Sequence, residues 1–336
     1  MIIEKKHILI ALAAIMLVVL LQVSCSQRPY NVIDINTPLR GPVHVAGEEL
    51  NEVLGEESVP VMQLEKAATV YIGFHLPQAD TLLFDIRDGS GQILKQFARM
   101  GNGPAEYLAP FLRNVKEEGG VLTFDLLDVE RCRLDSYKYE IAGNQLAMVK
   151  SQKLPQETIP IGQLLQTERG FLGILDNTGS DMFTLDADME NFQKHPYVDF
   201  QKMTASEGQL FHTASCVSPD GKHVALAFLN LPRIDIVDSS GHTEHTCYYG
   251  RRIAAADAKS DERYFGYIRC NEDYLYVKYL AEHGRNLILK ISWNGEIAGV
   301  YDLDRDLVSF SIIDGSLYGM SMSPTTRGVA YVRYVL

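Results

Sequence analysis

Two groups of residues have the types and the spacing of metal ligands. The first is "DLDRDL", in which Asp302, Asp304 and Asp306 alternate as the first three carboxylates of a calcium-binding loop do. That loop also needs Gly at its sixth position and Glu at its twelfth, whereas this chain has Leu307 and Ile313 there. The pattern therefore predicts a solvated loop and not an EF-hand.

The second group is "HTEHTC", where His245 and Cys247 stand two residues apart and would share one face of a strand. A structural zinc site takes four such ligands, and no second pair of this kind follows in the sequence. Ordinary strand residues are the favoured interpretation. We predict neither a metal nor a cofactor.

A glycine-rich stretch raises the question of phosphate binding. "FARMGNGPAEYLAP", residues 97–110, places two glycines and a proline between two apolar runs. A phosphate-binding loop needs a third glycine or a closing Lys-Ser/Thr, and this stretch has neither. Pro104 also lacks an amide hydrogen to donate. We interpret the stretch as a hinge between two structural units, in which glycine permits turns closed to other residues.

Nucleophilic catalysis finds no support in the sequence. A serine hydrolase of the nucleophile-elbow type carries G-x-S-x-G, and "GSLYG" and "GMSMS" both miss this pattern. A metal-dependent hydrolase or lyase, with ligands from several repeats meeting at a central channel, stays the alternative to a binding or scaffold role. The sequence favours binding and leaves enzymatic activity open.

Arginines are the strongest candidates for ligand contacts. Guanidinium groups form bidentate contacts with carboxylates and phosphates. We predict that Arg233, Arg252 and Arg285 lie on one face of the molecule and bind an anionic ligand or an acidic peptide. The alternative is that each arginine pairs with an acid of a neighbouring unit. The chain has 31 Lys and Arg against 43 Asp and Glu, a net charge of −12, which argues against nucleic acid as a partner.

The elements that must position these residues are strands. Beyond the N-terminal segment no helical period is sustained, and short alternating or β-branched runs end at Gly, Asn, Asp or Pro. The clearest unit starts at His212, where "HTASCVS", "HVALAF", "RIDIVD" and "TEHTCYY" are separated by "PDGK", "LNLP" and "SSGH". Four antiparallel strands with short connections are typical of one propeller blade.

Five other units share the second half of this one. A charged residue starts the third strand of each unit at intervals of about 50 residues: Asp80, Arg131, Asp181, Arg233, Arg285 and Arg327. The last unit has only three strands, and an early strand such as "VPVMQLE" (residues 59–65) is predicted to supply the fourth. The predicted fold is all-β: a six-bladed β-propeller of four-stranded antiparallel blades, closed by an N-terminal strand.

Two motifs carry a resemblance to a family. "GNGPAEY" after the strand "ILKQFARM" resembles the G-x-GPxEY element of the TolB-like six-bladed propeller proteins, and "SPDGK" at residues 218–222 is similar to their later blade turn. Ala105 stands where that family usually has Gly. The resemblance implies the fold and an exported lipoprotein, and it implies no particular activity.

The N-terminal segment has the features of an export signal. Two lysines precede an apolar run from Ile8 to Leu21, which is shorter than the roughly 20 residues of a membrane-spanning helix. "LLQVSC" resembles a bacterial lipoprotein signal, although Gln22 departs from the usual aliphatic residue. We predict a signal peptide over residues 1–24, lipidation of Cys25, a lipid-attached tether over residues 25–45 and the propeller over residues 46–336. Cleavage by ordinary signal peptidase, or a retained anchor, is the alternative.

The resemblance to lipoproteins also implies a location. Ser26 after the cysteine resembles the signal that sends such proteins to the outer membrane, facing the periplasm or the cell surface. The predicted partners are the membrane, through the lipid, and an unknown protein, peptide or anionic ligand. Four cysteines remain in the mature chain: Cys132, Cys216, Cys247 and Cys270. They allow three pairings if all are used, and buried free thiols are favoured.

Overall fold

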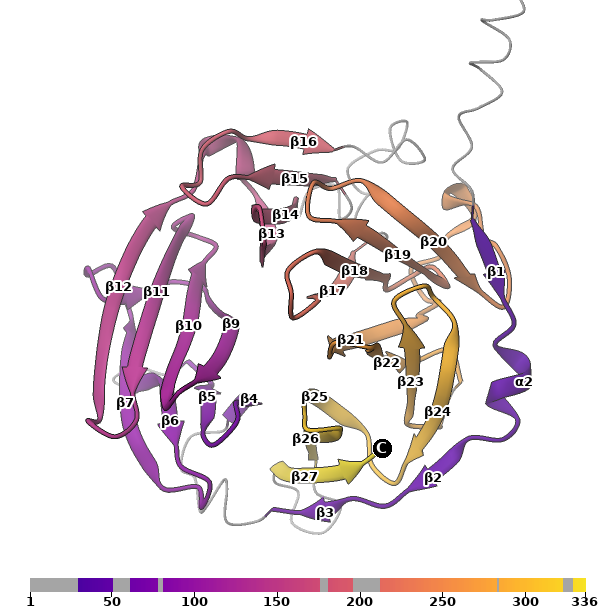
Figure 1. The fold of residues 1–336 in the computed structure, drawn as a ribbon, viewed down its shortest axis with the longest axis horizontal. Helices are drawn as coiled ribbons and strands as arrows, with labels where there is room; N and C mark the ends of the chain where they lie inside the picture. The colour runs from indigo at the N-terminus through magenta and orange to yellow at the C-terminus, as the bar shows by residue number, and fades with distance from the viewer. Residues whose placement is uncertain are drawn as a thin grey trace, which may run out of the picture.

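The computed structural model describes residues 30–50, 61–77, 81–175, 181–195, 212–282, 284–322 and 329–336. These residues form six small, mostly antiparallel sheets arranged in a ring around a central channel (Figure 1). The chain is a six-bladed β-propeller, as predicted. Among the residues described, no helix is long and apolar enough to cross a membrane.

The first three blades follow the chain from residue 61 onward, and their strands are given from the channel outward. The first contains β4 (Val61–Lys66), β5 (Tyr71–His75), β6 (Leu82–Arg87) and β7 (Ile93–Met100), with β8 (Glu106–Tyr107) beside β7. The second contains β9 (Pro110–Glu118), β10 (Val121–Asp128), β11 (Arg133–Glu140) and β12 (Gln145–Lys153). The third contains β13 (Ile161–Thr167), β14 (Gly170–Leu175), β15 (Met182–Leu185) and β16 (Gln193–His195).

The other three blades complete the ring. The fourth contains β17 (Thr213–Val217), β18 (His223–Phe228), β19 (Arg233–Asp238) and β20 (Thr243–Tyr249). The fifth contains β21 (Phe265–Cys270), β22 (Tyr274–Tyr279), β23 (Leu287–Ser292) and β24 (Ile297–Leu303). The sixth contains β25 (Leu307–Ile313), β26 (Ser316–Met322) and β27 (Val329–Val335). Among the described residues, the 3₁₀ turns Gln156–Thr158 and Ala255–Asp257 lie in connections.

The strand that closes the ring is not the predicted one. The fourth strand of the last blade is β3 (Glu48–Glu49), which pairs antiparallel with β27. The predicted segment, residues 59–65, instead falls mainly in β4, the innermost strand of the first blade, which lies against β25. The prediction of an N-terminal strand is confirmed, but the strand comes earlier in the chain. A short strand suffices because β27 needs only a partner for its exposed edge.

The segment before β3 lies along the outside of the ring (Figure 1). β1 (Asn31–Ile33) pairs parallel with β20, and β2 (Val43–Val45) pairs parallel with β24. Between them α2 (Asn36–Leu39) buries Leu39, and Ile35 is buried beside it. Residues 31–45, which we expected to be part of a tether, therefore pack on the propeller.

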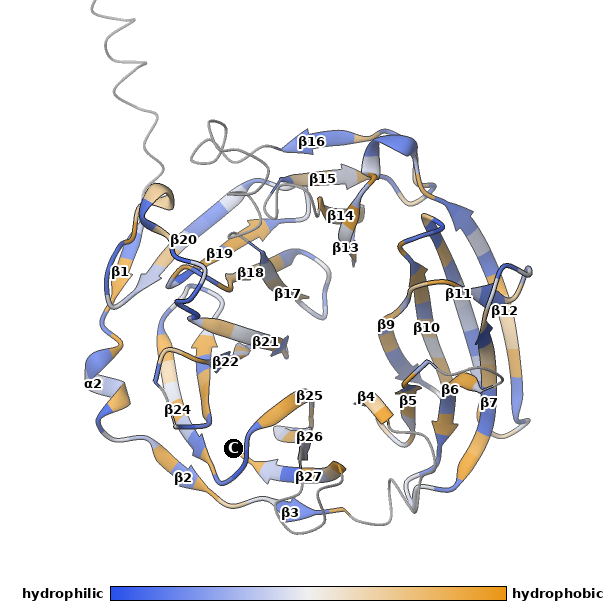
Figure 2. Ribbon diagram, turned by 180° about the vertical axis from the view of Figure 1, so that it is seen from behind, coloured by the Kyte–Doolittle hydropathy of each residue, from blue (hydrophilic) through white to orange (hydrophobic). Residues whose placement is uncertain are grey.

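The hydrophobic core lies between adjacent blades, where apolar stretches recur in their strands (Figure 2). Between the first two blades, Phe84, Phe97, Phe124 and Tyr137 contact one another in sequence, with centroid separations of 5.5 Å, 5.4 Å and 5.3 Å. Such pairs add roughly 0.5–1.5 kcal/mol each beyond the area they bury. Packing between blades thus holds the ring together.

The repeat read from the sequence is present in the structure. Asp181 immediately precedes β15, Arg233 is the first residue of β19, and Arg131 and Arg285 stand two residues before β11 and β23. The prediction is confirmed at these four positions, whereas Asp80 and Arg327 lie outside the described residues. Tight turns then join the third and fourth strands. In two of them Asp88 or Asp238 accepts backbone hydrogen bonds through its carboxylate, and Gly91 or Gly241 has a positive φ.

Candidate functional site in the central channel

The channel contains a cavity of about 520 Å³ that is lined by residues of the innermost strand of every blade. These strands, β4, β9, β13, β17, β21 and β25, surround the centre of the ring in Figure 1. Polar side chains recur at about the same place on successive inner strands, namely Gln63, Arg113, Gln163, Ser215 and Tyr267. This spacing repeats the 50-residue period of the blades. Side chains far apart in the sequence therefore face one small volume.

Irregular strand pairing brings these side chains toward the channel. The registers of β4, β9, β13, β21 and β25 each contain one extra residue on the inner strand. A β-bulge bends its strand and turns a side chain away from the regular alternation. On β4 the bulge lies between Val61 and Gln63, directly before the polar residues of the cavity.

A carboxylate lies at the centre of the polar lining. Glu65 is 8% exposed and accepts hydrogen bonds from Gln63 Nε2 at 2.7 Å, Tyr267 Oη at 3.0 Å and Ser311 Oγ at 3.0 Å. Arg269 forms an ion pair with it. Burial acts to raise the pKa of Glu65, but Arg269 and the hydrogen bonds outweigh it and hold the pKa below its ordinary value. Glu65 is therefore an ionised, fully engaged structural acid.

Arg113 faces the same cavity but, unlike Glu65, has no oppositely charged partner among the described residues. Its Nη1 donates to the backbone oxygen of Leu112 at 2.9 Å, and its guanidinium lies 5.3 Å from the centroid of the Phe111 ring. Within the described part of the chain, no carboxylate forms an ion pair with Arg113. Burial first, and then the nearby charge of Arg269, lower the pKa of Arg113. The side chain is a half-buried cation whose charge is not neutralised by an adjacent acid.

The cavity is therefore positive inside an acidic protein. The charged side chains among its described lining residues are Lys66, Arg113 and Arg269 against Glu65. The Lys66 ammonium lies 4.5 Å from the ring centroid of Tyr71. Because low-dielectric walls strengthen electrostatic interactions, an excess cation here attracts anions more strongly than one on the surface does.

The three arginines predicted as ligand contacts lie elsewhere. Arg233 is 3% exposed, and its Nε and Nη2 donate to Asp235 at 2.8 Å and 2.7 Å. Arg285 contacts Asp302 at 3.4 Å and the Leu39 backbone oxygen at 3.2 Å. None of these residues lines the channel cavity.

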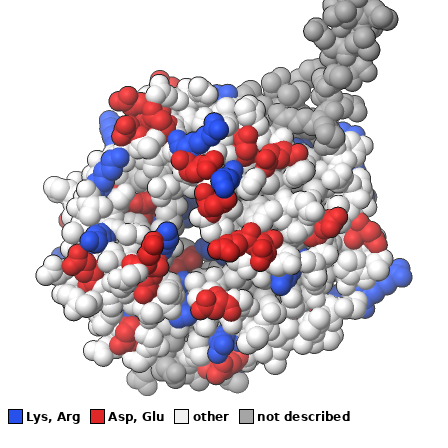
Figure 3. All heavy atoms as spheres, viewed as in Figure 1, with Lys and Arg blue, Asp and Glu red and all other residues white. Residues whose placement is uncertain are grey.

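Arg252, the third of them, is exposed and stacks on Tyr30, with the guanidinium 4.5 Å from the ring centroid. Arg252 and Arg285 thus hold the N-terminal segment against the ring. On the face shown in Figure 3, acidic and basic side chains are interspersed and the basic ones form no continuous patch. Whether the three arginines bind a ligand stays a prediction, although each contacts groups of the protein itself.

The residues considered as metal ligands have other partners. Asp302 pairs with Arg285, Asp304 accepts a hydrogen bond from Tyr334 Oη at 2.7 Å, and Asp306 pairs with Lys278 at 2.7 Å. In the second candidate, His245 is exposed and Cys247 is buried. The described residues include no group of three or more His, Cys, Asp or Glu placed to hold a metal ion.

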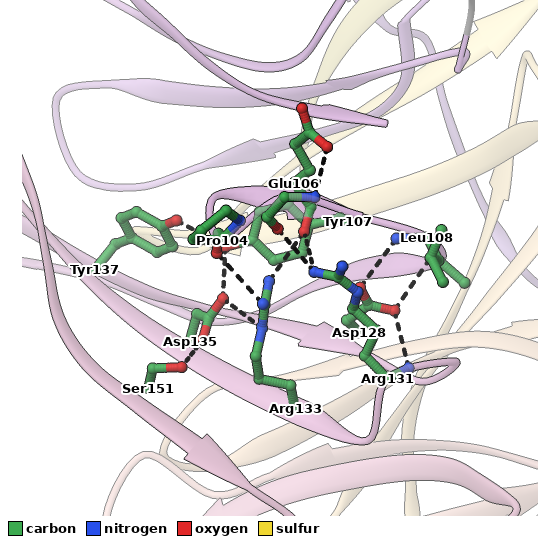
Figure 4. A network of polar contacts seen from close by, with 12 residues as sticks. Pro104, Glu106, Tyr107, Leu108, Asp128, Arg131, Arg133, Asp135, Tyr137 and Ser151 are labelled. Atoms are coloured by element: carbon green, nitrogen blue, oxygen red, sulfur yellow. Dashed lines mark hydrogen bonds and ion pairs between the residues drawn. The ribbon is translucent and has the colours of Figure 1, made fainter. Parts of the chain in front are cut away.

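The glycine-rich stretch is the connection between the first two blades (Figure 4). It folds back so that β8 pairs parallel with β7, and the Glu106 carboxylate accepts the Gly103 amide at 2.6 Å. Gly101 has a φ of 149°, and a Cβ there would lie 2.2 Å from the Glu106 carboxylate. The loop therefore needs glycine at that position, and its interpretation as a hinge is confirmed.

Two arginines of the second blade fix this hinge (Figure 4). Arg131 Nη1 donates to the backbone oxygens of Gly103 and Glu106 at 3.0 Å and 2.9 Å, and Arg133 Nη2 donates to that of Glu106 at 3.0 Å. Tyr107 then inserts its hydroxyl between Asp135 and Tyr137 at 2.8 Å and 2.7 Å. Arg131, in the turn before the third strand, thus joins its blade to the preceding one.

Sequence reasoning missed Glu65, Arg113 and Arg269, although a signal for Arg113 existed. The repeat was followed along the third strands, which are easy to align because a charged residue precedes each of them. Gln63, Arg113 and Gln163 are spaced 50 residues apart on the first strands. Extending the same period to those strands indicates Arg113, whereas Glu65 and Arg269 lie outside this series.

Solved structures with the same architecture share little sequence with this chain. A member of the DUF4221 family from Bacteroides vulgatus is 10% identical, with a TM-score of 0.55 over 86% of this chain and 96% of that one. A protein from Bacteroides fragilis described as exported is 12% identical, with a TM-score of 0.52 over 91% and 98%. The shared feature is the β-propeller fold.

A catalytically inactive virginiamycin B lyase from Staphylococcus aureus, solved with quinupristin, is also similar. It is 9% identical, with a TM-score of 0.50 over 86% of this chain and 99% of that one. No family model matches the chain, and no curated protein matches it in sequence. At these identities the likeness establishes the fold and not an activity.

Proposed function

We propose that this protein is an exported binding module that holds a small anionic ligand in its central channel. The observation that carries the proposal is Arg113, a half-buried cation in a cavity of about 520 Å³ without a carboxylate in ion-pair contact among the described residues. An unpaired charge removed from water is costly to a folded protein. A bound carboxylate or phosphate would offset that cost.

The rest of the lining suits such a ligand. Arg269 is held in place by Glu65, so it adds positive potential next to Arg113 without being free to move. Gln163 and Ser215 line the cavity from the third and fourth blades, where Ser215 Oγ donates to Gln163 Oε1, and their remaining donor and acceptor positions can bond polar groups of the ligand. Small-molecule sites are typically concave and carry a few convergent polar groups, as here.

The test compares Arg113→Met with Arg99→Met, a control at an exposed arginine of β7. Acetate, succinate, glutarate and inorganic phosphate serve as probes in thermal-shift and calorimetric titrations. We expect at least one probe to bind wild type and the control, and to bind Arg113→Met about 10- to 150-fold more weakly, as the loss of one charge-assisted hydrogen bond implies. Equal binding by Arg113→Met, or no binding of any probe to wild type, would refute the proposal.

We also propose that the chain is a lipoprotein anchored through Cys25, related to the TolB-like propeller proteins and located at the outer membrane. Residues 1–29 lie outside the described structure. What supports the proposal is the signal-like sequence before Cys25 and the hinge built from "GNGPAEY". Because Asn31 already pairs with β20, the free tether would be roughly 20 Å long at most.

Anchoring is tested with Cys25→Ala and, as the matched control, Ser26→Ala, both expressed with the intact signal. Fatty-acid labelling and the mass of the N-terminal peptide are measured after membrane fractionation. The control should carry lipid and Cys25→Ala should carry none. An unmodified Cys25 in the wild-type protein would disprove lipidation and leave the channel proposal untouched.

A further inference from the structure

Two cysteines from neighbouring blades meet at the channel wall. Cys216 lies on β17 of the fourth blade and is buried, and Cys270 ends β21 of the fifth blade and is half-buried. Both line the cavity, and β17 packs directly against β21. Cys270 Sγ lies 2.9 Å from the backbone oxygen of Val217, the residue that follows Cys216 on β17. A pair of thiols 54 residues apart in the sequence thus lies side by side.

The other two cysteines are placed where neither can compete. Cys247 lies on β20 of the same blade as Cys216, but β18 and β19 separate the two strands. Three strand spacings amount to about 14 Å, beyond the Cα separation that a disulfide spans. Cys132 lies in the second blade, in the turn between β10 and β11, packed with Leu127 and Leu134. The structure supports none of the three ways to pair all four cysteines. It supports one disulfide, between Cys216 and Cys270.

We propose that Cys216 and Cys270 form a disulfide bond that links the fourth and fifth blades at the wall of the channel, while Cys132 and Cys247 stay reduced. The bond replaces the packed thiol pair and requires an oxidant, which we specify as a disulfide such as that of oxidised glutathione or of an oxidised dithiol protein. In the exported compartment such disulfides are present.

The exposure of the two thiols sets the order of the steps. Cys270 is the accessible one, so its thiolate attacks the disulfide of the oxidant, one oxidant sulfur leaves as a thiol, and a mixed disulfide forms. Cys216 then loses its proton, attacks Cys270 Sγ and expels the second oxidant thiol. The two protein thiols give up two electrons and two protons, and these reduce the oxidant disulfide to two thiols. Burial, followed by the neighbouring thiol, raises the pKa of Cys216 and favours its protonated form, so Cys270 and not Cys216 makes the first attack.

The bond would act on the site described above. Arg269 directly precedes Cys270 on β21, and it lies close enough to Cys216 to interact with its charge. A covalent link at Cys270 therefore restrains the strand that carries one of the two channel arginines. This consequence concerns geometry, and the disulfide itself does not depend on what the channel binds.

The experiment uses the purified full chain with its signal segment removed, incubated with reduced and oxidised glutathione mixtures over a range of ratios. The protein is denatured with iodoacetamide, digested without reductant and mapped by mass spectrometry. We expect one cross-linked species joining the peptides of Cys216 and Cys270, and alkylation of both Cys132 and Cys247. Because the oxidant is supplied, the result does not depend on export or lipidation.

Variants exclude indirect explanations. In Cys216→Ser the Cys270 peptide should carry glutathione, since the mixed disulfide can no longer be resolved. Wild type should lose several degrees of Tm on reduction, whereas the double variant Cys216→Ser/Cys270→Ser should lose none. Alkylation of both cysteines at the most oxidising ratio, a bond to Cys132 or Cys247, or glutathione retained on wild-type Cys270 would each overturn the proposal.

Discussion

Replacing Glu65 by Gln should destabilise the propeller through the channel ion pair. The change keeps the size of the side chain but removes the charge that faces Arg269, whose side chain is only 28% exposed. Leaving one partner of a buried pair without the other costs about 3–5 kcal/mol, and the partial exposure of Arg269 favours the lower end. We expect a loss of about 3 kcal/mol in the free energy of unfolding. With an unfolding entropy of about 2.1 cal/mol/K per residue, that corresponds to a Tm lower by about 5 °C.

The assay is thermal and urea unfolding followed by circular dichroism, with Glu118→Gln as the control. Glu118 pairs with Lys116 at 3.1 Å, but both side chains are more than 70% exposed, so this change should cost less than about 0.5 kcal/mol. The double variant Glu65→Gln/Arg269→Met should regain part of the lost stability, because it removes both charges together. A Glu65→Gln protein as stable as the control would show that Glu65 does not hold Arg269 in the channel.

The same prediction has a pH dependence. The folded-state pKa of Glu65 lies below its unfolded value of 4.5, so its ionised form stabilises the native state fully above that pH. As the pH falls through the folded-state pKa, the carboxylate is protonated and the contribution is lost. The stability difference between wild type and Glu65→Gln should therefore be constant near neutrality and shrink on acidification below pH 4.5. A difference that grew on acidification would contradict the assigned direction of the shift.

Two further predictions separate structural roles from binding. Arg233→Gln should lower the free energy of unfolding by about 3–5 kcal/mol, because it leaves the fully buried Asp235 without its cation. If urea unfolding were unchanged and ligand binding were weakened, the result would favour a binding role for Arg233. Tyr107→Phe should cost about 1–3 kcal/mol through the lost hydrogen bonds to Asp135 and Tyr137, measured the same way, and a cost near zero would mean that the hinge does not depend on them.

Local signals in the sequence were sufficient for the architecture. Alternating β-branched runs, turns such as Asp238 to Gly241 and a charged residue before each third strand indicated six blades, because strand period and turn chemistry are properties of a few adjacent residues. The hinge at residues 97–110 was likewise predicted from the sequence, because the stretch lacks the third glycine or the closing Lys-Ser/Thr of a phosphate-binding loop. Closure of the ring by an N-terminal strand was also predicted, because an open edge strand is unfavourable wherever it lies.

The particular partners were decided only by the tertiary structure. Glu48 and Glu49 close the ring although two acidic residues do not predict a strand. They pair because the chain path places their backbone beside the open edge of β27. Arg233 was predicted from the sequence as a ligand contact, and only the structure shows that it is buried against Asp235. Arg113, Arg269 and Glu65 share a cavity only because six bulged or regular inner strands converge on one axis. The ion pair between Glu65 and Arg269 joins residues 204 positions apart, and no local pattern in the sequence encodes such a contact.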